Sequence, residues 1–244
     1  MGKRLRHPPL VEALVEFRFA PDQWDWTIPG RLYEQLQQEF PQRHEVRPLT
    51  VSFPGPQPLP SSGLPAPERI QFKRRDGTAM VQSGPGLLVI NHLREYPTWE
   101  RFRQLVLDVY EKHWNVAGDL PLTRVGMRYI NHIGEKWLDS VRRLTVLAPV
   151  EEYLGGDVQD FYQRYDVRSD EPRGFLVHQC GTGDIGRGRG VMLDLDFFST
   201  ELSQQVSTND LYNWLEGAHE RIEDAFQKSL SKELFSALEG EEVP

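Results

Sequence analysis

The sequence predicts an α+β protein made of two similar halves. Two observations support this prediction. A Gly-x-Gly turn that leads into an apolar strand occurs twice, as GPGLLVINHL at 84–93 and as GRGVMLDLDF at 188–197. Each strand is followed, after a polar gap, by a helical pattern that carries a tryptophan, at 96–114 and again at 211–235. A pattern that recurs in this order indicates an internal duplication.

The first half shows the two periodicities that distinguish strands from helices. Strands alternate apolar and polar residues, and helices repeat apolar residues every three or four positions. Asp76-Gly77 is a strong hairpin signal between two of the strands. In order, the pattern predicts a strand at 10–19, a helix at 29–39, strands at 69–75, 78–83 and 86–93, and a helix at 97–115. The segment 54–67 has six prolines in fourteen residues and is predicted to be a loop.

The second half restarts with a strand and closes with a long helix. It contains predicted strands at 122–133, 160–168, 174–180 and 189–198, a mixed segment at 136–155, and a final helix at about 209–236. We therefore expect residues 1–120 and 121–244 to form two α+β repeats that merge into one globular unit.

Tandem α+β repeats of this kind commonly share one antiparallel sheet. We expect a curved sheet with the helices on one face and the other face open. In strand and helix order, this arrangement resembles the saddle of the TATA-binding-protein type, which implies a fold and no function. The acidic net charge argues against the DNA-binding role of that saddle.

Composition and charge limit the class of protein. The chain has 244 residues and a formal net charge of −8, with a pI near 5.4, and it lacks the basic footprint of most nucleic-acid binders. Its one cysteine excludes an internal disulfide, and zinc-ligand spacings are absent. No apolar run approaches the roughly 20 residues that span a bilayer. We expect a cytoplasmic protein without a membrane segment.

Charged residues gather on the polar faces of two predicted strands. Glu12, Glu16 and Arg18 share one face of the first strand, and Arg124 and Arg128 share one face of the strand at 122–133. If these strands are neighbours, Glu16 is expected to lie opposite Arg128. The pattern fits a solvated sheet face with ion pairs, and it also fits a polar concave site built by both halves.

The strand at 189–198 and the segment before it offer two further candidates. Asp194 and Asp196 share a face, and their oxygens could bind Mg²⁺ or Ca²⁺. The segment GTGDIGRGRG at 181–190 could cradle a phosphate with Arg187 and Arg189 as clamps. A strand follows it where the phosphate-binding motifs require a helix, so a hairpin tip is the competing interpretation.

A Cys/His pair is the remaining candidate for nucleophilic chemistry. His178 and Cys180 lie two apart on one predicted strand and share its face. Such a spacing separates the side chains by roughly 6–7 Å, which is too far for a direct hydrogen bond. We therefore assign no catalytic residue.

The opening of the chain, HPPLVEALVEFRF at 7–19, resembles that of a sporadically distributed family of bacterial and archaeal proteins of similar length. The matching positions are Pro8, Pro9, Leu10, Glu12, Glu16, Arg18 and Phe19. RVGMRYINHI, with Arg128, Tyr129 and Asn131, is similar to the family's Arg-Tyr-x-Asn block, and the DLDFF stretch and the terminal helix also fit. The family has no established activity. Its patchy distribution resembles that of mobile defence or toxin–antitoxin operons, which implies a partner-dependent role.

Three hypotheses follow. The first is a non-enzymatic binding or assembly protein with a protein partner, which a mixed-charge sheet face would favour. The second is an RNA- or nucleotide-binding protein or nuclease, with RNA before DNA, which a basic patch would favour. The third is a metal-dependent enzyme at Asp194 and Asp196, which a third carboxylate or a histidine nearby would favour. The candidate binding residues are Glu12, Glu16, Arg18, Arg124, Arg128, Asn131, Arg187, Arg189, Asp194 and Asp196; no metal ligand or cofactor is assigned, and the oligomeric state is left open.

Overall fold

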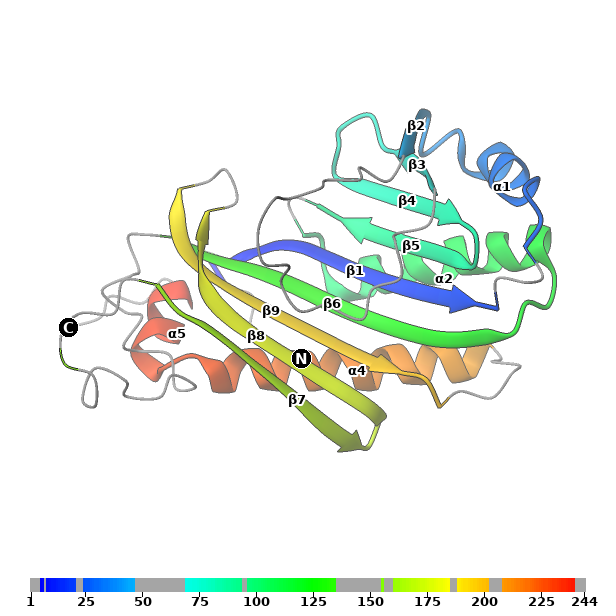
Figure 1. Ribbon diagram of the computed structural model, residues 1–244. Helices are drawn as coiled ribbons and strands as arrows, with labels where there is room; N and C mark the ends of the chain where they lie inside the picture. The colour runs from blue at the N-terminus through cyan, green and yellow to red at the C-terminus, as the bar shows by residue number, and fades with distance from the viewer. Residues whose placement is uncertain are drawn as a thin grey trace, which may run out of the picture. The chain divides into compact units, whose positions relative to one another are not determined.

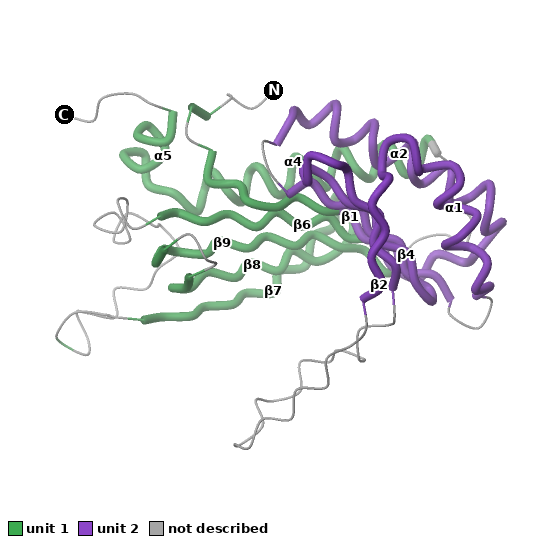
Figure 2. Tube along the Cα trace, turned by 90° about the horizontal axis from the view of Figure 1, so that it is seen from above, with its two compact units in different colours: residues 1–14, 126–201, 209–244 green, residues 15–125, 202–208 purple. Residues whose placement is uncertain are grey.

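A computed structural model gives the fold, and it divides the chain into two compact units (Figure 2). The described residues are 5–6, 8–20, 24–46, 69–93, 96–134, 155, 160–184, 188–201 and 208–239. Unit 1 comprises residues 1–14, 126–201 and 209–244, and unit 2 comprises residues 15–125 and 202–208. The strands at 10–19 and 122–134 each contribute residues to both units.

The strands form a single nine-stranded antiparallel sheet, as the α+β prediction requires (Figure 1). The strands are β1 Leu10–Phe19, β2 Gln42–Val46, β3 Arg69–Lys73, β4 Ala79–Gly84, β5 Leu87–His92, β6 Leu122–Gly134, β7 Tyr162–Asp170, β8 Arg173–Asp184 and β9 Arg189–Ser199. Their order across the sheet is β2-β3-β4-β5-β1-β6-β9-β8-β7. The described helices are α1 Ile28–Leu36, α2 Trp99–Ala117, α4 Thr208–Ser229 and α5 Lys232–Glu239.

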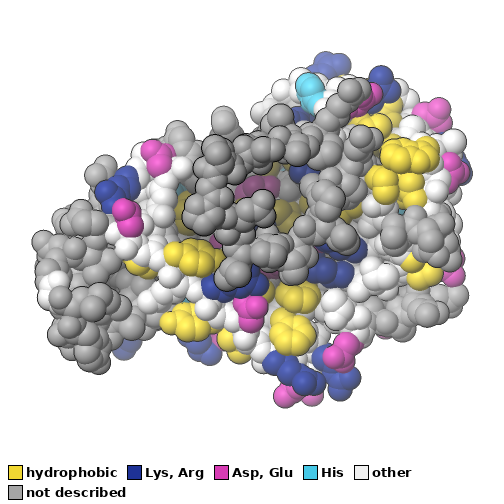
Figure 3. Space-filling view, viewed as in Figure 1, with side chains coloured by type: hydrophobic (Ala, Val, Ile, Leu, Met, Phe, Trp, Pro, Cys, Tyr) yellow, Lys and Arg dark blue, Asp and Glu magenta, His cyan; other side chains and the backbone are white. Residues whose placement is uncertain are grey.

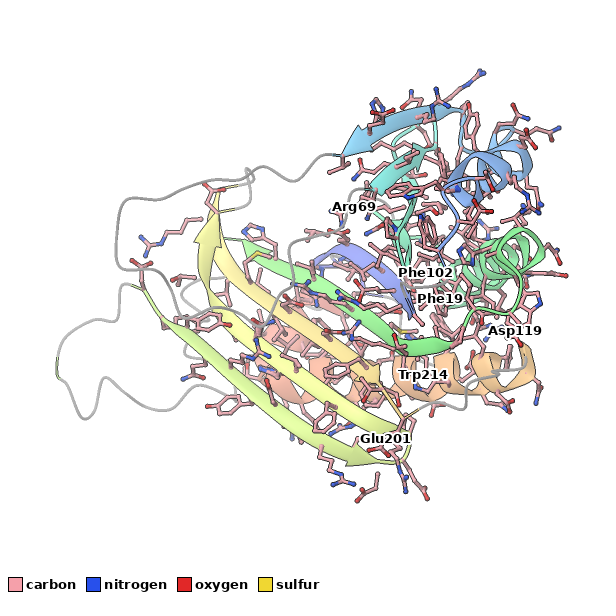
Figure 4. The ribbon with its side chains drawn as sticks, turned by 45° about the vertical axis from the view of Figure 1, so that its right-hand side comes forward. Phe19, Arg69, Phe102, Asp119, Glu201 and Trp214 are labelled. Atoms are coloured by element: carbon pink, nitrogen blue, oxygen red, sulfur yellow. The ribbon has the colours of Figure 1, made fainter. Side chains whose placement is uncertain are left out.

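Unit 2 packs α1 and α2 against one face of its strands. Thr98 caps α2 by accepting a hydrogen bond from the backbone N–H of Arg101, and Gly118 ends the helix with a φ of +73°. Phe17 on β1 packs on Tyr110 of α2, with ring centroids 4.7 Å apart. Figure 4 shows Phe19 and Phe102 in the same layer between strands and helix, and both are buried.

Turn chemistry explains the β3–β4 hairpin. Asp76 accepts hydrogen bonds from the backbone N–H and the hydroxyl of Thr78, at 2.9 and 2.8 Å. Gly77 follows with a φ of +70°, a conformation that glycine adopts without strain. The hairpin predicted at Asp76-Gly77 is confirmed.

Unit 1 packs α4 against one face of β6, β9 and β8, and no described helix lies on the other face of these strands, which we call the open face (Figure 1). Trp214 of α4 packs on Phe197 of β9, with ring centroids 5.9 Å apart. One turn and a half further along α4, His219 Nδ1 lies 3.0 Å from the Tyr129 hydroxyl of β6. These contacts fix which face of each strand points toward the helix.

Two elements differ from the prediction. Between α1 and α2 the chain has four strands rather than the predicted three, because β2 at Gln42–Val46 pairs with β3. The final helix, predicted at 209–236, is two helices that break between Ser229 and Lys232. Ser231 lies at this break and caps the N-terminus of α5, because its hydroxyl accepts a hydrogen bond from the N–H of Leu234 at 3.1 Å.

Two predictions concern segments that the structure does not describe in full. The proline-rich loop at 54–67 lies outside the described residues, as does the mixed segment at 136–155 apart from Gly155. Among the described helices, none combines the length and the apolar content that a bilayer crossing needs.

Candidate binding surface of unit 1

The open face of unit 1 consists of the strand side chains that alternate with those in contact with α4. His178, Tyr129 and Phe197 contact α4, so their immediate neighbours along each strand point away from it. Directly opposed residues of neighbouring strands lie on the same side of the sheet. The β7–β8 and β8–β9 registers therefore identify the residues of β7, β8 and β9 that share this face. The face is made by Arg128, Tyr162, Arg164, Asp166, Arg168, Phe175, Val177, Gln179, Asp194, Asp196 and Phe198.

Arg128 and Asp194 form the central ion pair of this face. Arg128 Nε donates to Asp194 Oδ1 at 2.7 Å, and Nη2 donates to Asp194 Oδ2, so the contact is bidentate. This hydrogen bonding raises the pKa of Arg128 above its ordinary value, and the charges of Asp194, Asp196 and Glu12 act in the same direction. The pair exists because β6 and β9 are neighbours in the sheet.

Asp194 and Asp196 share the open face, as predicted. They lie opposite Gln179 and Val177 of β8, neither of which adds a carboxylate or an imidazole. Among the described residues, no group of three or more His, Cys, Asp or Glu side chains is placed to hold a metal ion. A cation at Asp194 would have to displace the bidentate guanidinium of Arg128.

The predicted pair between Glu16 and Arg128 does not form. In unit 2, Glu16 Oε1 accepts hydrogen bonds from Arg124 Nη1 at 2.6 Å and from Arg18 Nε at 2.7 Å. The register of β1 against β6 therefore places Arg124, four residues before Arg128, within reach of Glu16. β1 and β6 are neighbours as expected, and only the predicted ion-pair partner of Glu16 was wrong.

The glycine-rich segment 181–190 is largely paired strand. Gly183 lies opposite Gly190, and Asp184 lies opposite Arg189, at the end of the β8–β9 hairpin. Arg189 Nη2 donates to Asp160 at 2.8 Å, so its charge is already paired, and Arg187 lies outside the described residues. A Cβ at Gly181 would approach the Phe161 carbonyl oxygen to 2.8 Å, and one at Gly190 would approach the Ile133 carbonyl oxygen to 2.6 Å. Close strand packing explains these two glycines.

Three residues that the sequence analysis considered point toward the helix layer instead of the open face: Asn131, Cys180 and His178. Asn131 is buried and donates through Nδ2 to the Leu193 carbonyl at 3.2 Å. Cys180 is buried as well, and burial raises the pKa of its thiol to about 12, which keeps it protonated and a poor nucleophile. His178 lies 2.8 Å from the Ser229 hydroxyl, which itself donates to the Ala225 carbonyl. His178 Nε2 must therefore carry the proton.

Sequence reasoning missed the exposed apolar side chains at the β7 margin. Tyr162 is 66% exposed, Tyr165 47% and Val167 42%, and Phe175 on β8 is 37% exposed. Phe175 stacks on Phe198, with ring centroids 5.7 Å apart. The signal was visible in the sequence DFYQRYDVR at 160–168, where Tyr162 stands at an even position and Tyr165 and Val167 at odd positions. A half-buried strand would show apolar residues at only one parity.

Figure 3 shows hydrophobic, basic and acidic side chains interleaved on the side of the molecule that faces the viewer in Figure 1. The ion pairs of unit 1 explain the mixture, because Arg128, Arg164 and Arg189 each contact an aspartate. The open face of unit 1 is therefore a mixed-charge surface with aromatic groups.

Unit 2 has a separate hollow of about 500 Å³ at the first turn of α1. It is lined by Trp26, Pro29, Glu45, Val46, Arg69, Ile70, Ser83 and Gly84. Arg69 Nε and the Ser83 hydroxyl are buried without a hydrogen-bond partner in the described part of the chain, and Figure 4 shows Arg69 at the start of β3. Glu45 lines the same hollow and offsets the charge of Arg69, so the hollow favours no particular charge.

Comparison with known proteins adds no relative. A scan of the chain against protein-family models found no match, and a search of curated proteins found none either. The geometry of the open face is therefore the basis for a functional proposal.

Proposed function

We propose that this chain is a non-enzymatic binding or assembly protein whose open face of unit 1 holds a protein partner. One observation carries the proposal. The charged side chains of this face are paired with each other, while aromatic side chains stand exposed among them. Exposed aromatic residues inside a polar surround are the usual anchors of protein–protein interfaces.

The pairing of the arginines argues for protein over nucleic acid. A nucleic-acid binder gains affinity when free Lys and Arg side chains neutralise phosphates and release counterions. Arg128 and Arg164 are each hydrogen-bonded to an aspartate, and the whole chain carries a net charge of −8. Phosphate binding would therefore have to break ion pairs that already exist.

Single-stranded RNA is the alternative ligand. Tyr162 and Phe175 lie on the same face as Arg164 and Arg168, and bases can stack on aromatic rings beside arginine. The capture experiment below separates the two classes, because it measures protein and nucleic acid in the same sample.

The order of the strands supports an internal duplication as the origin of the surface. In the first half, β5 lies beside β1, and β4, β3 and β2 follow outward; in the second half, β9 lies beside β6, and β8 and β7 follow outward. Each half thus places its last strand beside its first. We propose that the two halves are pseudo-repeats in a saddle of the TATA-binding-protein type.

The partner is proposed from the resemblance noted in the sequence. The opening PPLVEALVEFRF is similar to that of proteins whose patchy distribution resembles defence-type operons. A component of such an operon commonly acts together with the product of a neighbouring gene. We propose that the partner is a protein encoded in the same operon as this chain.

A pair of matched variants tests the proposed surface. Phe175 on the open face and Tyr212 on α4 are both 37% exposed, so Phe175→Asp and Tyr212→Asp introduce the same charge at equal exposure. Tagged wild-type and variant proteins are used to capture partners from the native host, and protein and nucleic acid in the eluates are both quantified. We expect Phe175→Asp to lower recovery of a stoichiometric protein roughly tenfold, and Tyr212→Asp to leave it unchanged.

Two results would contradict the proposal. One is recovery of RNA or DNA in place of a stoichiometric protein. The other is equal recovery with Phe175→Asp and wild type, provided that both proteins have the same circular dichroism spectrum and melting temperature.

A further inference from the structure

β7 is the last strand of the sheet on the side of unit 1, and no described strand pairs with its outer edge (Figure 1). Large apolar side chains stand exposed on both of its faces, with Tyr162 on the open face and Tyr165 and Val167 on the other. Proteins normally protect an edge strand from pairing, with charged side chains, with prolines, with bulges or with a covering segment. β7 has no proline, and its four charges alternate in sign, so they can attract a second strand as well as repel one.

The hydrogen-bond pattern identifies which backbone groups of β7 are available. The N–H of Thr182 in β8 donates to the carbonyl of Phe161, at 3.0 Å, and residues 161 and 182 are opposed in the extended register. Since hydrogen-bonded pairs alternate along an antiparallel ladder, the odd-numbered residues of β7 bond to β8. The even-numbered residues, from Tyr162 to Asp170, direct their N–H and C=O groups outward.

The same even-numbered positions carry charges of alternating sign. Arg164, Asp166, Arg168 and Asp170 follow one another on the open face. Their side chains are half to nine-tenths exposed, and among the described residues their ion pairs run along β7 itself, from Arg164 to Asp166 and from Arg168 to Asp170. Charges of alternating sign are complementary to an antiparallel copy of themselves in some registers and repulsive in others.

We propose that β7 pairs antiparallel with β7 of a second copy of this chain. The two-fold axis passes between Val167 of one copy and Val167 of the other, and we call this an axis through Val167. Outward-directed residues must face outward-directed residues, so even-numbered positions face even-numbered positions. An axis through Arg164, Asp166 or Arg168 would place like charges opposite each other. An axis through Val167 places Arg164 opposite Asp170 and Asp166 opposite Arg168 of the second copy, so all four charges find an opposite partner on each strand.

Pairing about an axis through Tyr165, the preceding odd-numbered residue, gives less complementary charges. An axis through Tyr165 would oppose Arg164 and Asp166, but it would leave Asp170 opposite Asp160. The axis through Val167 also brings the two exposed Val167 side chains together, which removes apolar surface from water.

Pairing of this kind would affect the open face directly. Opposed residues in an antiparallel pair lie on the same side of the sheet. The open faces of unit 1 in the two copies would therefore point to the same side, and a partner with two matching sites would bind with avidity.

Charge reversal tests the register. Asp166→Arg alone places two arginines opposite each other, and Arg168→Asp alone places two aspartates opposite each other. The double variant Asp166→Arg/Arg168→Asp restores opposite charges about Val167, and it creates repulsion about Tyr165. We expect wild type and the double variant to sediment as dimers, and each single variant to dissociate at roughly tenfold higher concentration.

Cysteine cross-linking supplies an independent readout. Val167 would face Val167 at a non-hydrogen-bonded position with Cα atoms about 4.5 Å apart, a distance that permits a disulfide. We expect Val167→Cys to form a disulfide-linked dimer under mild oxidation. Tyr165→Cys, on the same face of the same strand, is the matched control and should remain monomeric in a denaturing gel.

A monomeric wild type at every concentration would overturn the proposal, and so would cross-linking of Tyr165→Cys without cross-linking of Val167→Cys. Circular dichroism of each variant confirms that it is folded. The assay uses the purified chain alone, so its failure and the failure of the proposed partner surface are distinguishable.

Discussion

At the scale of single residues, burial determines the chemistry of the histidines. His113 of α2 is buried and stacks on Phe19, with ring centroids 5.0 Å apart, and its Nε2 has no hydrogen-bond partner in the described part of the chain. Burial disfavours the charged imidazolium and lowers the pKa of His113 to about 4. The residue therefore acts as an aromatic core residue that is neutral at physiological pH.

This shift predicts a pH-dependent stability. Between pH 4 and 6.5 the unfolded chain binds a proton at His113 that the folded chain does not bind. The free energy of unfolding therefore rises with pH across this window, and the contribution of His113 is fully present above 6.5 and is lost toward pH 4. We expect urea unfolding to lose about 3 kcal/mol more in wild type than in His113→Phe over this range. Parallel pH profiles for the two proteins would contradict the assignment.

A second residue-scale prediction concerns two opposed glycines of the β8–β9 hairpin. A Cβ at Gly190 would lie 2.4 Å from His132 Nε2 and 2.6 Å from the Ile133 carbonyl oxygen, so β6 and β9 would have to separate locally. Among the described residues, a Cβ at Gly183, directly opposite, meets only Met192 Cγ at 3.4 Å. We expect Gly190→Ala to cost about 1–3 kcal/mol in urea unfolding and Gly183→Ala to change it by less than about 0.5 kcal/mol. Equal effects would show that backbone entropy, and not close packing, governs both positions.

At the scale of elements, alternation in the sequence identified β1, β6 and β9, because one face of each is buried. It missed β2, whose QRHEV sequence is exposed and lacks an apolar alternation. Ion-pair partners depend on register and on which strands are neighbours. The pairs of Glu16 with Arg124 and of Arg128 with Asp194 could therefore not be predicted from single strands.

The break between α4 and α5 gives a prediction at this scale. Leu230 and Leu234 are both buried, so the apolar spacing runs through the break and hides it in the sequence. The hydroxyl of Ser231 caps α5, and Ser231→Ala should lower the free energy of unfolding by about 1 kcal/mol. Ser231→Asp preserves an accepting oxygen and should stay near wild type. Indistinguishable melting temperatures for alanine and aspartate would show that the cap does not stabilise α5.

At the scale of the whole molecule, the order of strand and helix patterns in the sequence predicted the α+β class and the single antiparallel sheet. The location of a binding surface was less predictable, because it depends on which residues the fold leaves exposed. Of the nine candidate residues that the structure describes, six lie in unit 1, among them Arg128, Asp194 and Asp196 on its open face, while Glu16, Arg18 and Arg124 form an ion cluster in unit 2. The sequence of β7 carried a signal for the aromatic residues at its margin, but their exposure was established only by the structure.

Hydrogen–deuterium exchange of the captured complex tests the central claim most directly. The account predicts slower exchange on partner binding in peptides from β7 and β8, residues 162–184, and unchanged exchange in α2, residues 99–117. Protection confined to α2, or to the strands of unit 2 at residues 69–92, would contradict the assignment of the open face of unit 1 as the partner surface.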